Sequence, residues 1–210
     1  MLRLWSLLVN RGRAVRTSAG DPRDASARDS ETGLFTHRHF DERLAAEIEL
    51  AEAYEEPFTL MAIGIDRYDA FRELHGDVRA AQLNALVADV LYRRMRLADV
   101  ATSDGHDFLI LMPETSADAA ALSFRRLRHS AEDAGRAQPD ESFHQFTLSA
   151  GVFEYDGSRP PEIVRGALWA LERARALGGN DIHRFTPGRS DWKPAPVSFP
   201  ADQPVQLRRA

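Results

Sequence analysis

Apolar residues recur in this chain at two spacings, which separate the expected helices from the expected strands. Between residues 38 and 54, Phe40, Leu44 and Ile48 recur every four positions, as on a helix with one buried face. Residues 58–65 (FTLMAIGI) are apolar almost throughout. An unbroken run of this length predicts a central strand that is covered on both sides.

The rest of the chain continues this alternation of helices and strands. A helical stretch is expected from Asp66 to His75, interrupted near Gly76-Asp77 and resumed over 78–96. Ser116 predicts the N-cap of a helix from Ala117 to about Gly135, because its hydroxyl can accept an unpaired backbone N–H. Further predictions are a loop over 137–142, a strand over 145–155, a helix from Pro160-Pro161 to Gly178-Gly179, and a last strand over 181–185.

Residues 99–112 (DVATSDGHDFLILM) predict a β-hairpin. Asp104-Gly105 is placed as the pair of central turn residues, since both centres of a type I′ turn need positive φ. The apolar run after the turn indicates a strand that is covered on both faces, ended by Pro113. The element order predicts an α+β domain in which helices pack on a mostly antiparallel five-stranded sheet, with the first strand and the hairpin at its centre.

Composition narrows the classes of function. The chain has 210 residues, enough for one domain with appendages, and an apolar fraction of 43%, which is ordinary for a globular protein. The formal net charge of −5 argues against nonspecific binding to nucleic acid, which is not an expected partner. The absence of cysteine excludes disulfides and thiolate nucleophiles, as suits a reducing compartment.

Residues 1–28 are predicted to be a leader and linker, and 187–210 a tail. No apolar run is long enough to span a bilayer, but residues 1–16 are basic, acid-poor and bear Trp5. That segment is interpreted either as a frayed terminus or as a membrane-surface, partner-docking or targeting segment. The tail is proline-rich, which predicts an extended segment that is either disordered or a docking peptide.

Several motifs, taken in order, resemble a known family. They are Asp29-x-x-Thr32-Gly33-Leu34, Ile63-Gly64-Ile65-Asp66-Arg67-Tyr68, the hairpin residues Asp104-Gly105-His106-Asp107-Phe108, Thr147-Leu148-Ser149-Ala150-Gly151-Val152, and Arg175-x-x-Gly178-Gly179-Asn180. The ordered set resembles the GGDEF (diguanylate cyclase) domain, with the hairpin at the place of the signature. The resemblance covers residues 29–186 and implies a nucleotide-cyclase-like (ferredoxin-like) fold. In active members it also implies condensation of two GTP molecules to cyclic di-GMP by a homodimer with magnesium.

The family's metal-binding positions are altered in this chain. The resemblance places Gly64 where the family has its first carboxylate, and His106 at the third signature position, where it has the second. Glycine offers no side-chain ligand, and imidazole is a poor ligand for magnesium, which prefers hard oxygen donors. Asp66 and Asp107 lie nearby and, with His106, remain weak metal candidates.

The positions for phosphate and base are altered as well. Asp104 replaces the first signature glycine, so its carboxylate repels phosphate where backbone donors are wanted. The family's guanine-binding Asn and Asp fall at Arg72 and Ala81. Arg175 stands for the family's Lys and, with Arg72 and Asn180, is a weak candidate for nucleotide binding; an ordinary solvated helix residue is the other interpretation of Arg175.

The family's product-binding inhibitory motif, Arg-x-x-Asp, resembles Arg96-Leu97-Ala98-Asp99. Here it lies one residue closer to the signature than in the family. Without an insertion, Met95 and Ala98 take the two functional positions. A slip of one residue turns a side chain to another face, so an intact inhibitory site is not expected.

Metal, phosphate and base positions are all changed while the apolar pattern is kept, which predicts a pseudoenzyme. We expect a catalytically inactive regulatory module without a cofactor, acting through protein partners of unknown identity or through a homodimer. The first alternative is a receptor that binds GTP or cyclic di-GMP without turnover. The second is an atypical cyclase that uses GTP and Mg²⁺ through Asp66, His106 and Asp107. The family implies a bacterial cytoplasm, with membrane contact through residues 1–16 left open.

Overall fold

The computed structural model describes residues 27–30 and 32–186. The predicted tail and residues 1–26 of the predicted leader and linker fall outside these residues. Ala27 and Arg28, which were assigned to the linker, belong to the fold, because Ala27 is buried and Arg28 makes an isolated bridge to Phe35. The elements in chain order are α3 (His37–Tyr54), β1 (Phe58–Ile65), α4 (Tyr68–His75), α5 (Asp77–Arg94), β2 (Val100–Asp104), β3 (Asp107–Pro113), α6 (Ala117–Arg136), the 3₁₀ turn η1 (Glu141–Phe143), β4 (Leu148–Glu154), α7 (Pro160–Ala176) and β5 (Ile182–Arg184). None of the helices within these ranges is both long and apolar enough to cross a bilayer.

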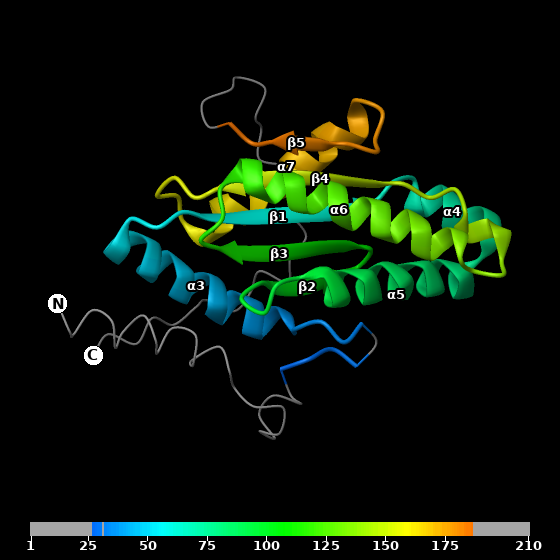
Figure 1. The fold of residues 1–210 in the computed structure, drawn as a ribbon, viewed down its shortest axis with the longest axis horizontal. Coiled ribbons are helices and arrows are strands. Elements are labelled where there is room, and N and C mark those ends of the chain that lie inside the picture. Colours follow the sequence, from blue (N-terminus) through cyan, green and yellow to red (C-terminus); the bar gives the residue numbers. More distant parts are fainter. Residues whose placement is uncertain (1–26, 31, 187–210) are drawn as a thin grey trace.

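The five strands form one sheet in the order β2-β3-β1-β4-β5 (Figure 1). All neighbours are antiparallel except β4 and β5, which run parallel. The predicted α+β class and mostly antiparallel five-stranded sheet are therefore confirmed. The central place of the hairpin is only half right. β3 lies beside the central β1, but β2 is the edge strand of the sheet, where Phe35 makes an isolated bridge to Thr102.

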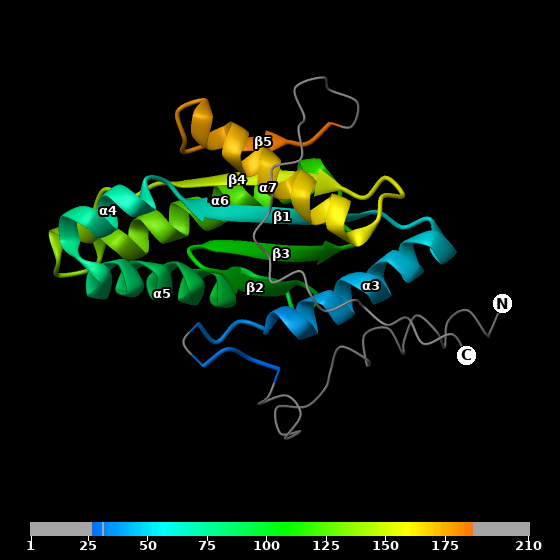
Figure 2. The same ribbon diagram turned by 180° about the vertical axis from the view of Figure 1, so that it is seen from behind.

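β1 is buried along its whole length because helices cover both faces of the sheet. Residues at alternate positions point to opposite faces. Met61, Ile63 and Ile65 join the core under α5 and α6, whereas Phe58 and Leu60 join the core under α3 and α7. Figure 1 shows α6 over one face of the sheet, and Figure 2, seen from behind, shows α7 over the other. The predicted apolar run thus corresponds to a strand between two cores.

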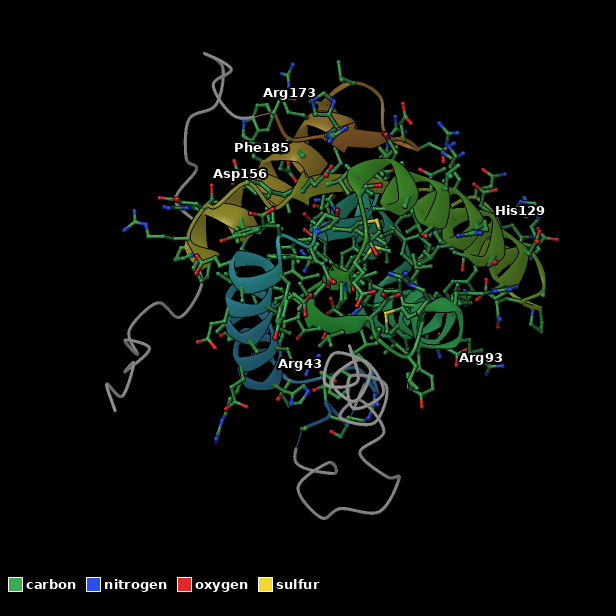
Figure 3. All side chains as sticks on the ribbon, turned by 60° about the vertical axis from the view of Figure 1, so that its left-hand side comes forward. Arg43, Arg93, His129, Asp156, Arg173 and Phe185 are labelled. Atoms are coloured by element: carbon green, nitrogen blue, oxygen red, sulfur yellow. The ribbon has the colours of Figure 1, made fainter. Side chains whose placement is uncertain are left out.

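Side chains fill the space between sheet and helices, while the labelled charged groups Arg43, Arg93 and His129 lie at the periphery (Figure 3). Helix α7 approaches β4 closely at Gly151. A Cβ at Gly151 would clash with the backbone of α7 at Ala167 and Leu171. This close packing fixes α7 over the sheet and so determines where its C-terminal half lies.

The helix boundaries agree closely with the sequence predictions, and the strand boundaries less so. Ser116 is the N-cap of α6, and its Oγ accepts from the Ala119 N–H. The predicted strands over 145–155 and 181–185 are shorter in the structure, at Leu148–Glu154 and Ile182–Arg184, and part of the predicted loop over 137–142 belongs to η1. An apolar pattern marks where a strand can be buried, but ladder pairing decides where it ends.

The hairpin turn lies one residue later than predicted. Asp104 pairs with Asp107 as the last pair of the β2–β3 ladder, so the two loop residues are Gly105 and His106. The positive φ falls on Gly105, at 63°, and not on Asp104. The assignment of Asp104 as a central turn residue was therefore wrong. A glycine at the first central position satisfies the turn by itself, so Asp104 can remain extended.

This geometry predicts different effects of substitution at the two residues. Gly105→Ala should lower the free energy of unfolding by about 1 kcal/mol, because an L-residue is strained at positive φ. Asp104→Ala should change it by less than about 0.5 kcal/mol, because Asp104 is an exposed strand-end residue. Urea denaturation of both variants measures the difference. An equal loss in both would favour a turn centred on Asp104-Gly105.

Candidate functional site

The signature hairpin brings its residues to the ends of β1 and β4, beneath the C-terminal half of α7. Gly64, near the end of β1, is paired with Asp107 of β3 on one side and with Ser149 of β4 on the other. One region of the fold therefore contains the candidate residues Gly64, Asp66, His106, Asp107 and Arg175.

The guanidinium of Arg175 occupies the space next to Gly64. A Cβ at Gly64 would clash with the Nη2 of Arg175 and with the Oδ1 of Asp107. Arg175 Nη2 donates to Asp107 Oδ1 at 2.5 Å and Nη1 donates to Asp107 Oδ2 at 3.3 Å. The missing side chain of Gly64 thus leaves room for a two-pronged ion pair between α7 and β3.

Arg175 is firmly held in this position. Its side chain is 20% exposed and that of Asp107 is 18% exposed. Nη1 also donates to Glu172 at 2.7 Å, and Nη2 lies 3.4 Å from the carbonyl oxygen of Ile65. Burial lowers the pKa of Arg175, but hydrogen bonds and charge from Asp107 and Glu172 outweigh it and hold this pKa above its usual value. Arg175 therefore stays charged, and its guanidinium N–H groups donate to acceptors within the protein.

Asp66 ties the end of β1 to two other segments. Its Oδ2 accepts from Thr147 Oγ1 at 2.7 Å and from the Asn180 backbone N–H at 2.8 Å, and its Oδ1 accepts from Ser149 Oγ at 2.7 Å. The Asn180 carbonyl in turn accepts from Arg128. Asp66 and Asn180, both named as candidates from the sequence, thus join β1, β4 and the turn after α7.

His106 and Asp107 are adjacent in sequence, but their side chains contact different parts of the molecule. The imidazole of His106 stacks on the ring of Tyr68, with centroids 4.6 Å apart and planes 7° apart. Burial raises the pKa of the Tyr68 phenol above its usual value, partly offset by Arg72. Asp107 instead contacts α7 through Arg175. The two signature residues that were named as metal candidates are therefore engaged separately.

A cavity of about 330 Å³ lies beside the stacked rings, between α4, α5 and the hairpin. Arg72, Ala81 and Asn84 are among the residues that line it, together with Tyr68 and His106. The two positions that the sequence assigned to base recognition are thus brought to one cavity. The Arg72 guanidinium is half-exposed and pairs with Asp69 at 2.9 Å.

Asn84 was not singled out from the sequence. Its Nδ2 donates to the Gly105 carbonyl at 3.2 Å. Its Oδ1 is buried, and no hydrogen-bond donor within the described ranges reaches it. An unsatisfied acceptor of this kind suits a ligand N–H. The sequence carried no signal for it, because Asn84 lies on an ordinary polar position of α5.

Arg96 and Asp99, the residues that resemble an inhibitory site, bind one another. The Arg96 backbone N–H and its Nη2 both donate to the Asp99 carboxylate at 2.9 Å, and Nη2 also donates to Thr115 Oγ1 at 2.5 Å. The Asp99 side chain is 4% exposed. This pair connects the α5–β2 loop to the turn after β3, so it has a local structural role.

The donor set at the end of β1 does not fit a magnesium centre of the kind that the family resemblance implies. Magnesium that bridges phosphates needs several oxygen ligands in a near-octahedral shell. Gly64 offers none, Asp107 is paired with Arg175, and Asp66 accepts three hydrogen bonds. Across 27–30 and 32–186, no three His, Asp or Glu side chains are grouped as metal ligands would be.

Comparison with known proteins identifies relatives of this fold. The chain is 27% identical over 168 residues to the diguanylate cyclase DgcP of Pseudomonas aeruginosa, covering 79% of this chain and 25% of that protein. It is 26% identical over 159 residues to the probable diguanylate cyclase DgcT of Escherichia coli, covering 74% and 35% respectively. The chain therefore spans between a quarter and about a third of the lengths of these two relatives.

Solved structures give the same fold. The GGDEF domain of DgcB from Caulobacter crescentus, in complex with c-di-GMP, has a TM-score of 0.70 at 21% identity, covering 80% of this chain and 98% of that one. The diguanylate cyclase SiaD of Pseudomonas aeruginosa, in complex with its activator SiaC, also has a TM-score of 0.70, at 23% identity, covering 87% and 68%. At these identities the likeness establishes the fold.

The family assignment rests on a match along most of the chain. The family model described as "Diguanylate cyclase, GGDEF domain" matches residues 26–181. This range contains β1, the signature hairpin and α7, whose positions were described above. The chain belongs to the GGDEF domain family.

Proposed function

We propose that this protein is a non-catalytic GGDEF signalling module that acts through contact with other proteins or with a second copy of itself. The observation that carries the proposal is the Arg175 guanidinium beside Gly64, paired with Asp107. In active relatives the corresponding strand end is expected to bind magnesium and GTP. Here a fixed positive side chain and a glycine occupy it.

The phosphate side of the site supports the same proposal. Asp104 lies at the end of β2, one residue before the turn, in the place of the first signature glycine. Its carboxylate adds negative charge where a triphosphate would approach the hairpin backbone. Arg175, the residue that stands for the family's phosphate-binding Lys, directs its donors to Asp107 and Glu172.

Two observations support a role in protein contact. The solved relative SiaD was crystallised with an activator protein, so the fold is compatible with protein recognition. Leu74 and Val78, on either side of the break between α4 and α5, are 77% and 73% exposed. Large exposed apolar side chains are groups that a partner protein can cover. A bacterial cytoplasmic location, with or without membrane contact through residues 1–16, stays a prediction.

The cavity beside Tyr68 favours a second candidate function, a receptor that binds GTP or cyclic di-GMP without turnover. Arg72 can donate to guanine O6 and N7, and the buried Oδ1 of Asn84 can accept from a base N–H. An atypical active cyclase through Asp66, His106 and Asp107 is the third possibility. It has the weakest support, because each of these side chains already contacts another protein group.

An activity assay tests the absence of catalysis. The full chain, incubated with GTP and Mg²⁺, should give no cyclic di-GMP above the enzyme-free blank, because the strand end lacks unpaired carboxylates to hold the metal. Products are separated by ion-pair chromatography, with an active diguanylate cyclase domain as positive control. Cyclic di-GMP that accumulates in proportion to protein concentration would overturn the proposal.

Calorimetry separates the docking module from the receptor. Titrations with GTP plus Mg²⁺ and with cyclic di-GMP should be flat under the preferred proposal. A saturable heat with GTP that weakens tenfold or more in Arg72→Ala would establish the receptor instead, since Arg72 lines the cavity. Arg38→Ala is the matched control, because Arg38 is an exposed arginine on another helix.

A comparison of the whole and the trimmed chain tests the two appendages. The full chain should recover partner proteins from its source cells that a chain lacking residues 1–19 and 187–210 does not, because apolar-basic and proline-rich segments are typical docking elements. Recovered proteins are identified by mass spectrometry and confirmed with purified components. Equal recovery by both chains would remove the appendages from the proposal and leave the folded domain as the contact surface.

A further inference from the structure

The C-terminal half of α7 carries a positive charge into the end of the sheet, at a position where the family relationship implies a metal. Three observations fix the place of that charge. The Cβ direction of Gly64 leads directly into the Nη2 of Arg175. Both guanidinium prongs reach the Asp107 carboxylate. Nη2 also lies near the Ile65 carbonyl oxygen.

This set of partners has the composition of a cation site. A carboxylate from β3, a carboxylate from α7 (Glu172) and a main-chain carbonyl from β1 surround one positive group. Oxygen ligands of these kinds are the ones that bind divalent cations in proteins. In this chain the positive group is covalently part of the protein, and the side chain that would compete for the same space is missing at Gly64.

We propose that Arg175 is an internal replacement for the divalent cation at the end of β1, so that the domain holds this strand end together without a metal ion. The inference deepens the proposed function and rests on it, since a fixed guanidinium both neutralises Asp107 and blocks the metal position. Gly64 and Arg175 then form a matched pair. The glycine makes space, and the arginine fills it with charge.

The pair predicts how the two residues depend on one another. A carboxylate introduced by Gly64→Asp should pair with the guanidinium after that group has moved aside, because the new Cβ would overlap Nη2. The single variant should therefore remain unable to bind a metal ion. When Arg175 is also changed to Met, the guanidinium is gone. No positive group then lies between the carboxylates of residue 64 and Asp107 and the Ile65 carbonyl. A metal ion should then take the place of the guanidinium.

The experiment measures Mn²⁺ binding by the loss of the free-ion signal in electron paramagnetic resonance, on the full chain. Wild type, Gly64→Asp and the control Glu172→Gln should show no saturable site below millimolar Mn²⁺. Gly64→Asp/Arg175→Met should bind one Mn²⁺ at least tenfold more tightly than the wild type, with a melting temperature that rises as Mn²⁺ is added. Saturable wild-type binding that Asp107→Asn abolishes would overturn the inference, as would a folded double variant that binds no metal.

A second measurement decides the matter if the double variant does not fold. Arg175→Lys keeps the charge and Arg175→Met keeps most of the volume. Arg175→Met should lower the melting temperature by roughly 5–10 °C, because it leaves Asp107 largely buried without its partner, whereas Arg175→Lys should lose less than half of that. Equal losses in the two variants would overturn the inference, because they would show that the cation itself is unimportant.

These outcomes are distinguishable from failure of the proposed function. Formation of cyclic di-GMP in the activity assay would refute the non-catalytic role whatever the metal titrations show. A wild-type metal site without product would refute only the replacement of the cation by Arg175. The two measurements therefore test separate statements about the same strand end.

Discussion

The ion pair between Arg175 and Asp107 is the interaction on which the character of this domain depends. It joins α7 to the signature hairpin in a place that is four-fifths buried. A buried charge is stable only when its partner is present, so removal of either residue should lower the stability of the fold. The close approach of α7 to β4 at Gly151 sets the position of the helix from which Arg175 reaches Asp107. Backbone packing and electrostatics therefore support the same arrangement.

Other polar groups that resemble a functional site are also used by the fold. Asp66 accepts from Thr147, Ser149 and Asn180, and thereby holds the ends of β1 and β4 to the turn after α7. Arg96 and Asp99 bind one another. Each group satisfies hydrogen bonds that would be costly to leave unmade in a partly buried place. In this chain these groups therefore contribute to the stability of the fold.

The two sides of the candidate site have different surroundings in this chain. On the side of α7 the space is filled by a guanidinium and its carboxylates. On the side of α4 and α5 a cavity of about 330 Å³ remains, lined in part by Tyr68 and Arg72. The two places are distinct, since His106 and Asp107, adjacent residues of the hairpin, contact different elements. The candidate site therefore combines a filled strand end on one side with a cavity on the other.

The sequence by itself determined the class of fold and the main elements. The apolar run of 58–65 forms β1 with the predicted bounds, and Ser116 is the N-cap of α6, because burial and capping depend on local residue types.

The turn at Gly105, the edge position of β2 and the strand ends depended on ladder pairing between distant segments. The family resemblance in the sequence also predicted altered metal and base positions. Only the tertiary structure brought Arg175 beside Gly64, 111 positions away in the chain, because the packing of α7 on the sheet places the guanidinium in the space that Gly64 leaves.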